Sequence, residues 1–273
     1  MKGTRFMRIY EIYDEENSLD IGVLLYYEKN KSCIIELRDE LDEWTAPLLF
    51  TGLVKRDIYT IPRDAAMMWV RERVIPSGRQ NIGDILSAHR LKEYDEMKLL
   101  ELAEGRCSHD GMVISRMDSL PQFVQKRSER NLRDCTALDD RKLLCFFKDG
   151  TVKRLALPDL EDYQGVEKVI ANRDLYETCT VGCGGYYVTF NDSIDIPAWL
   201  LHEKGKPVDV SYEDFITFTK KNVVDTTKAC DLLECTRQNL SYLVKQRDIT
   251  PVITGVKGNL YVKRDIVNGE TLL

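Results

Sequence analysis

The chain has 273 residues, of which 43% are hydrophobic and 31% charged, a composition typical of globular domains and unlike that of disordered chains. At roughly 100–200 residues per domain, this length predicts two or three domains. Lysine and arginine number 39 against 45 acids, giving a net charge of −6. The chain as a whole therefore lacks the basic character of a protein that coats nucleic acid.

The sequence contains no signal for membrane insertion. No apolar run approaches the roughly 18 residues that a spanning helix needs, and Met1–Arg8 lacks the apolar stretch of a secretory signal. We therefore expect a cytoplasmic protein without a membrane partner. The eight cysteines are scattered along the chain, which in a reducing compartment predicts buried thiols.

Residues 1–118 alternate strand and helix patterns and predict an α+β domain. After a strand at 8–12, apolar runs at 21–27 and 32–37 flank the polar turn 28–31 and predict a hairpin. Helices are expected at 64–74, 81–89 and 94–103, with Gly105 as the stop signal of the last. The charged stretch 119–140 has few large apolar side chains and predicts a linker or a charged surface helix.

Cationic and amide side chains gather around the helix expected to begin near residue 81. The unpaired amides of a helix start attract anions, so we predict an anion or protein-partner site there, formed by Arg73, Arg79, Gln80 and Asn81. The alternative is that the arginines of this region pair with acids of the helix at 93–104. The run from Tyr94 to Arg106 loosely resembles the N-terminal lobe of HipA-type toxin kinases. Without a kinase lobe, that resemblance implies a binding partner and no catalysis.

Residues 141–205 show a different pattern, in which short strands are joined by tight turns. Apolar runs at 143–147 and 151–157 flank Lys148-Asp149-Gly150, a turn in which glycine accepts positive φ. A short helix at 165–171 precedes further strands at 178–181, 186–190 and 193–196, joined by Gly-Gly and Asn-Asp turns. This pattern predicts a small meander sheet that holds one helix.

The run Leu143–Gly150, together with Asp174-Leu175-Tyr176 and Tyr186–Pro197, resembles the bacterial domain of unknown function 2442. The resemblance covers about 65 residues and rests mostly on turn residues. It implies a small α+β domain without known catalysis, followed in some members by a helix-turn-helix. Asn191 departs from that family, many members of which have Trp-Pro at this point.

Residues 206–273 contain two short amphipathic helices, at 226–234 and 236–246. Ala229, Leu232 and Leu233 form the inward stripe of the first helix, and Leu240, Leu243 and Val244 form that of the second. Thr226 or Thr227 is expected to cap the first helix and Thr236 the second. Cys235 alone separates the two helices, which predicts the tight crossing of a helix-turn-helix with small Ala229 at the close approach.

The outward side of the second helix has the chemistry of a DNA reader. Glutamine pairs with adenine and arginine with guanine, while lysine and tyrosine bind phosphates. Two β runs around a glycine-rich turn with Lys257, followed by Lys263-Arg264-Asp265-Ile266, predict a wing and a closing helix. The predicted DNA-binding residues are Thr236, Arg237, Gln238, Ser241, Tyr242, Lys245 and Lys257.

The order of these elements over Val224–Ile266 resembles the excisionase and MerR-like winged helix-turn-helix family. Glu234-Cys235 stands where many members have Gly-Val, and threonine replaces their usual serine cap. Residues 220–265 contain nine lysines and arginines against five acids, a local charge of +4 that leaves −10 for the remainder. An acidic body with one basic module favours selective over bulk DNA binding.

No enzyme motif stands out. Cys107-Ser108-His109-Asp110 joins a nucleophile type to a histidine and an acid, but neighbours in sequence seldom converge on one substrate, and a polar loop explains them. Cys179 and Cys183 lack the further ligands of a zinc site. We expect no catalysis, metal or cofactor.

The sequence thus predicts a bacterial transcriptional regulator that binds double-stranded DNA, with a homodimer and a protein partner of the N-terminal domain as further expectations. The alternative is an antitoxin-like or phage-defence interaction module that does not itself bind DNA.

Overall fold

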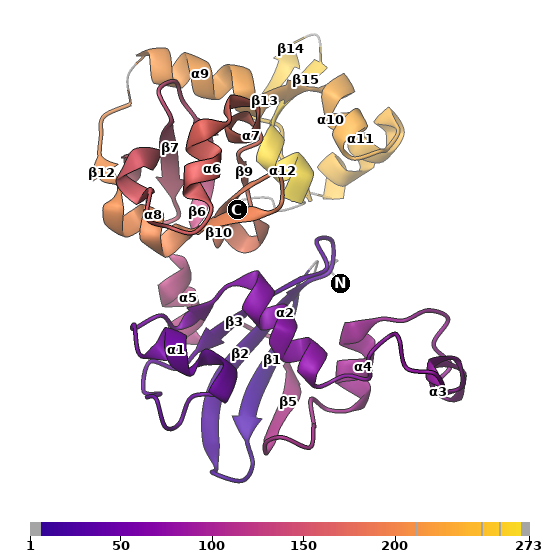
Figure 1. Cartoon of the computed structure of the whole chain (residues 1–273). Helices are drawn as coiled ribbons and strands as arrows, with labels where there is room; N and C mark the ends of the chain where they lie inside the picture. Colours follow the sequence, from indigo (N-terminus) through magenta and orange to yellow (C-terminus); the bar gives the residue numbers. More distant parts are fainter. Residues whose placement is uncertain (1–6, 211, 247, 257, 269–273) are drawn as a thin grey trace. The chain divides into compact units, whose positions relative to one another are not determined.

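The computed structural model describes residues 7–210, 212–246, 248–256 and 258–268 (Figure 1). The chain divides into two compact units between Gln125 and Lys126. Both combine helices with small antiparallel sheets, so the predicted multi-domain α+β class is confirmed. None of the helices in these ranges is both long enough and apolar enough to span a bilayer.

The first unit is built on one antiparallel sheet in the strand order β4-β3-β2-β1-β5. Its strands are β1 (Met7–Asp14), β2 (Leu19–Tyr27), β3 (Ser32–Leu37), β4 (Thr60–Ile61) and β5 (Met112–Met117). Its helices are η1 (Leu48–Phe50), α1 (Thr51–Val54), α2 (Arg63–Glu72), α3 (Ile82–Ala88) and α4 (Glu96–Leu102). The predicted hairpin is confirmed, because β2 and β3 pair from Tyr27 with Ser32 to Gly22 with Leu37.

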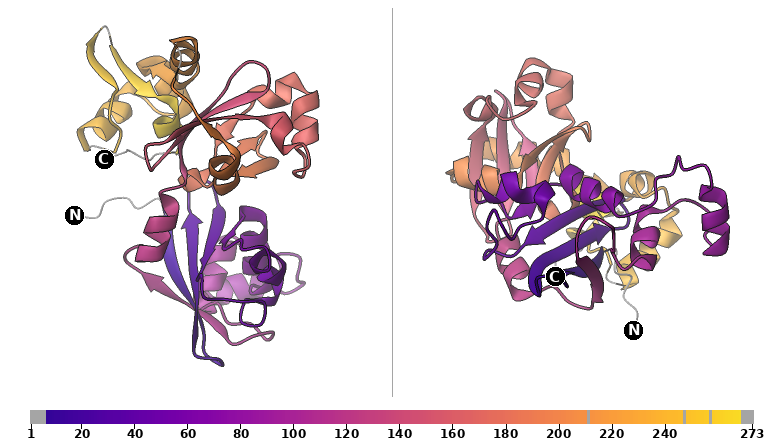
Figure 2. Two further views of the ribbon diagram at one scale, coloured as in Figure 1. Left: turned by 90° about the vertical axis from the view of Figure 1, so that its left-hand side faces the viewer. Right: turned by 60° about the horizontal axis from the view of Figure 1, so that its bottom comes forward.

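Helix α2 lies across one face of this sheet (Figure 2). Ala66, Trp69 and Val70 are its buried residues, at the i, i+3, i+4 spacing of an inward stripe. They share one apolar cluster with strand residues such as Ile35. Helix α3, by contrast, buries none of its residues and stands away from the sheet in both figures. The sheet and α2 therefore share the apolar core of this unit.

The three longer helices predicted for the first unit occur with ends that differ by one or two residues. Helix α4 shows why. Its first turn is capped by Asp95, whose Oδ1 accepts from the Lys98 amide at 3.0 Å. Beyond its last turn, Gly105 takes φ +74°, a value that glycine adopts at little cost. A local cap and a stop signal thus set the boundaries of α4, whereas α2 and α3 begin without a side-chain cap.

Of the linker or charged surface helix expected over residues 119–140, a short helix with exposed Lys126 is present, whereas the expected linker is wrong because a strand follows the helix. This stretch forms α5 (Gln122–Ser128) and β6 (Leu132–Ala137). Strand β6 pairs antiparallel with β7 (Lys142–Phe147), placing Cys135 opposite Cys145. Its polar residues Asp134 and Thr136 are buried, and the Thr136 hydroxyl accepts from the Asn222 side chain at 2.6 Å. Because its buried positions are partly polar, β6 lacked the apolar pattern that would have marked it as a strand.

The middle of the second unit contains two small sheets rather than the one meander that was predicted. One has the order β12-β8-β7-β6 and the other β11-β10-β9. The additional strands are β8 (Val152–Ala156), β9 (Thr180–Val181), β10 (Tyr187–Phe190), β11 (Ile194–Pro197) and β12 (Lys206–Pro207). The helices are η2 (Leu157–Leu160), α6 (Val166–Ala171), α7 (Arg173–Glu177), η3 (Cys183–Gly185) and α8 (Ala198–Lys204). The predicted turn between β7 and β8 is confirmed, with Gly150 at φ +85°.

The last part of the second unit has its own three-stranded sheet, in the order β13-β15-β14. Its elements are α9 (Tyr212–Asn222), β13 (Val223–Asp225), α10 (Thr226–Leu232), α11 (Arg237–Gln246), β14 (Ile253–Val256), β15 (Gly258–Val262) and α12 (Lys263–Asn268). A separate apolar cluster, which includes Ala229, Leu240 and Tyr261, holds them together.

Helix α9, which the sequence pattern did not indicate, contacts the sheet that contains β6 and β7. The Lys221 ammonium donates to the Ala137 carbonyl at 2.6 Å, and the Phe218 and Phe146 rings lie 4.9 Å apart. Since α9 runs directly into β13, the C-terminal elements begin from a helix that is anchored on the middle sheet.

Candidate functional site

Helices α10 and α11 meet across the turn 233–236, which is longer than the single residue, Cys235, that was predicted to separate them. Ala229 on α10 and Leu240 on α11 are buried in the same cluster. Glu234, in the turn, has φ +50°, which reverses the chain within a few residues. The close approach of the two helices therefore leaves room for the methyl group of Ala229.

The caps agree with the sequence at α11 and disagree at α10. The Thr236 hydroxyl accepts from the Asn239 amide at 3.3 Å, as predicted. Asp225, not Thr226 or Thr227, caps α10, with its Oδ1 accepting from the Lys228 amide at 2.8 Å. Thr226 instead exchanges two hydrogen bonds with the backbone of Asn259 in β15. The threonine prediction is wrong because β13 places Asp225 one position before the helix and Thr226 against β15.

Replacing Asp225 by alanine is expected to lower the free energy of unfolding of the second unit by about 1 kcal/mol, since one amide of α10 loses its acceptor. Thr227→Ala, a control at the position wrongly expected to cap, is expected to cost less than about 0.5 kcal/mol. Urea denaturation followed by circular dichroism measures both. A larger effect at Thr227 than at Asp225 would contradict the assignment of the cap.

One side of α11 is free of protein contacts that would bury it. Gln238, Ser241, Tyr242 and Lys245 are exposed, with 61% of Tyr242 accessible. On the opposite side, Leu240 is buried, and Leu243 and Val244 pack against the same cluster. The core contacts therefore fix which side of the helix faces water, and it is the side that the sequence predicts to read DNA.

Two further predicted residues stand differently. Arg237 is exposed, but its Nη2 donates to the Thr227 hydroxyl at 3.1 Å, so the guanidinium reaches toward the first turn of α10. Strands β14 and β15 form the expected hairpin, with Ile253 opposite Leu260. Lys257, predicted at its tip, lies outside the described residues.

The predicted anion site loses one of its four members to an internal ion pair. The side chain of Arg73 is only 2% exposed, pairs with Asp110 and lies over the Trp69 ring at 3.8 Å. Arg79, Gln80 and Asn81 are exposed, and Arg79 Nε donates to Asn81 Oδ1 at 2.9 Å. Because Asp110 already neutralises the charge of Arg73, the prediction that Arg73 belongs to an anion site is wrong.

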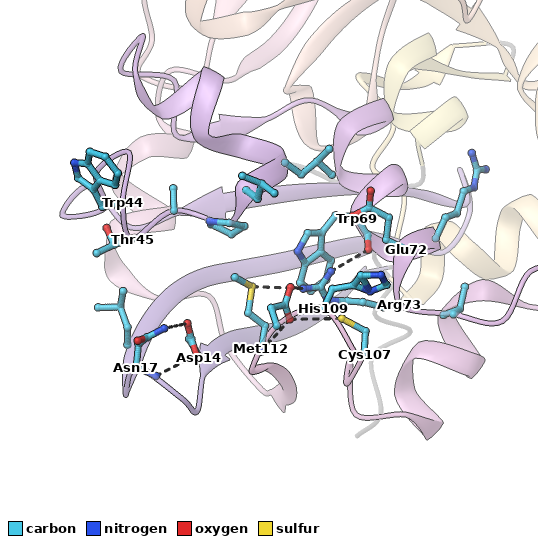
Figure 3. A pocket seen from close by; sticks show the side chains of 18 of the residues that line it. Asp14, Asn17, Trp44, Thr45, Trp69, Glu72, Arg73, Cys107, His109 and Met112 are labelled. Carbon is cyan, nitrogen blue, oxygen red and sulfur yellow. Dashed lines mark hydrogen bonds and ion pairs between the residues drawn. The ribbon is translucent and has the colours of Figure 1, made fainter.

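The Cys107–Asp110 stretch forms an irregular loop, as the sequence predicts. Asp110 Oδ1 accepts from the Cys107 thiol at 3.6 Å and from the Met112 amide at 3.1 Å. What the sequence did not indicate is that this loop meets Arg73 and Trp69 of α2 in the wall of one pocket (Figure 3). Their separation of more than 30 positions leaves no local pattern from which to infer it.

Of the cysteines in the C-terminal elements, Cys230 is buried, as expected, whereas Cys235 is partly exposed. Burial raises the pKa of the Cys230 thiol above its ordinary value, so this group stays protonated at neutral pH. Among the described residues, no group of three or more histidine, cysteine or acidic side chains is arranged to hold a metal ion.

Comparison with known proteins adds no assignment. No family model matches the chain, and searches of the curated proteins and of the solved structures find no match. The three family resemblances noted from the sequence therefore stay predictions.

Proposed function

We propose that this protein binds double-stranded DNA with sequence selectivity, as a bacterial transcriptional regulator, and that α10, α11 and the β14–β15 hairpin act as a winged helix-turn-helix. The observation that supports this most directly is the exposed side of α11. Its position opposite buried Leu240 makes it a fixed, water-facing surface of hydrogen-bonding side chains.

The residues on that side suit the two kinds of contact that DNA offers. A major groove about 12 Å wide admits an α-helix. Gln238 and Ser241 present short polar groups for base edges, and glutamine has the paired donor and acceptor that adenine requires. Tyr242 and Lys245 follow along the same side, where a hydroxyl and an ammonium bind phosphate oxygens. Arg237, held at Thr227, lies at the edge of this surface.

Charge supports the same interpretation. Residues 220–265 have a net charge of +4 within a chain of −6, and Lys228, Arg237 and Lys245 are all exposed. Attraction to phosphate is thus confined to the part of the chain that has the reading helix, while the acidic remainder disfavours unspecific contact.

Selection of binding sites from random duplexes by the full-length protein tests the proposal. We expect one sequence to be enriched, and an inverted repeat with half-sites about 10 bp apart would indicate a homodimer. In gel shifts on that site, Gln238→Ala is expected to lose about 1–3 kcal/mol and to relax preference at one base pair. Lys245→Ala is expected to weaken all sequences alike and to lower the salt slope by about 1.

The matched control is Lys168→Ala, which removes an exposed lysine on α6 of the same unit and is expected to bind as the unaltered protein does. If no duplex is enriched, or if both α11 variants bind as tightly as the unaltered protein, α11 is not the reading helix. In that case, retention of a protein partner by the same two variants would favour the interaction-module alternative.

A further inference from the structure

We propose that the pocket in the first unit binds a small, electrically neutral molecule that has a planar ring and a hydrogen-bond acceptor. The pocket has a volume of about 1160 Å³ and is lined by α2, the β1–β2 turn, the loop before η1 and the loop before β5. Ligand pockets typically measure about 300–1,000 Å³, so this one has room for a drug-sized molecule. The inference is independent of the proposed DNA binding.

Two buried N–H groups in the wall of the pocket lack an acceptor. Trp69 Nε1 and Arg73 Nε are covered and have no hydrogen-bond partner among the described residues, and both side chains line the pocket (Figure 3). Buried donors are nearly always hydrogen-bonded. An acceptor on a ligand would satisfy them after a small displacement of the side chains that cover these nitrogens.

The charges of the pocket favour a neutral acceptor over an anion. Arg73 is paired with Asp110, and Arg71 Nε donates to Glu96 Oε1 at 2.9 Å. The two guanidinium groups that line the pocket are therefore neutralised, whereas its carboxylates, Asp14, Glu72 and Asp110, outnumber them. A carboxylate or phosphate ligand would meet this excess of negative charge, and a cation would offer nothing to the unpartnered donors.

The loop before η1 provides an apolar surface for a ring. Trp44 is 85% exposed and Leu48 93% exposed, although both line the pocket. Asp42 holds the loop in place, since its Oδ1 accepts from the amides of Trp44 and Thr45, each at 2.9 Å. These and the Thr45 hydroxyl lower the pKa of Asp42, so the carboxylate stays charged and keeps the loop ordered. An indole presented in this way stacks readily on a planar ring.

Two matched probes, benzamide and benzoate, test the inference, because they share a ring and differ in charge. Binding to the full-length protein is followed through the ¹³C-methyl resonance of Met112, whose Sδ lies 3.5 Å from Arg73 Nη2. Benzamide at up to about 20 mM is expected to shift this resonance in a saturable way, as a millimolar ligand would. Benzoate is expected to bind at least about fivefold more weakly, for the electrostatic reason given above.

Trp44→Ala is expected to weaken benzamide about fivefold through lost stacking, without changing the melting temperature, because the side chain is exposed. Met68→Ala, a half-exposed residue of α2 that does not line the pocket, is the control and should bind as the unaltered protein does. Three results would each overturn the inference: no saturable shift with benzamide, equal binding of benzoate, or unchanged binding by Trp44→Ala. None of them bears on DNA binding, which is measured on α11.

Discussion

Replacing Asp110 by alanine is expected to lower the free energy of unfolding of the first unit by about 3–5 kcal/mol, the usual cost of leaving one member of a buried ion pair without its partner. Arg73 is almost fully buried, so removal of the carboxylate leaves its charge without a partner and poorly hydrated. Urea denaturation followed by the fluorescence of Trp44 and Trp69, the two tryptophans of the first unit, in a Trp199→Phe background measures the change in the first unit.

The matched control for this prediction is Glu96→Ala. It removes the partner of Arg71, whose side chain is 63% exposed, and exposed pairs contribute only about 0–1 kcal/mol. If the two variants lose similar amounts of stability, the Arg73–Asp110 pair is solvated in solution and contributes no more than an exposed pair does.

Leu240→Ala is expected to cost about 2–5 kcal/mol, the range for emptying a buried leucine site, and to abolish the proposed sequence-selective DNA binding. Leu240 is the residue through which α11 packs on Ala229 and the rest of the C-terminal cluster. Loss of this contact frees the helix from the one orientation that exposes Gln238 and Lys245. Urea denaturation of the second unit and gel shifts on the selected site measure the two effects.

Leu232→Ala serves as the control. The prediction that this leucine of α10 faces inward is wrong, because it is 40% exposed, and its replacement is expected to cost less than about 1 kcal/mol. The outcome that would contradict the packing of α11 is a Leu240→Ala variant that remains as stable as Leu232→Ala. A stable but inactive Leu240→Ala variant would instead show that α11 keeps its fold and loses only its orientation.

The sequence predicted the elements that depend on short-range signals. The β2–β3 hairpin, the turn at Gly150 and the helix pair α10–α11 each have their turn or cap residues within a few positions of the apolar pattern. The exposed side of α11 was predicted for the same reason, since helical spacing alone decides which residues lie opposite Leu240.

The sequence could not predict features that depend on tertiary partners. Strand β6 buries polar Asp134 and Thr136, and Thr136 accepts its bond from Asn222, which lies 86 positions away. The pocket depends in the same way on the pairing of Arg73 with Asp110 across 37 positions. No spacing rule connects such residues, so both the strand and the pocket become visible only in the folded chain.

The anchoring of α9 has a practical consequence for dissecting the protein. A fragment cut at residue 206, where the sequence suggested a domain boundary, would separate Phe218, Lys221 and Asn222 from their partners Phe146, Ala137 and Thr136. The isolated C-terminal fragment would therefore begin with α9, and this helix would expose the side chains that contact the middle sheet in the whole protein. A fragment made to test the proposed DNA recognition in isolation should therefore begin ahead of α5 (Gln122–Ser128), so that this helix and the whole second unit are kept.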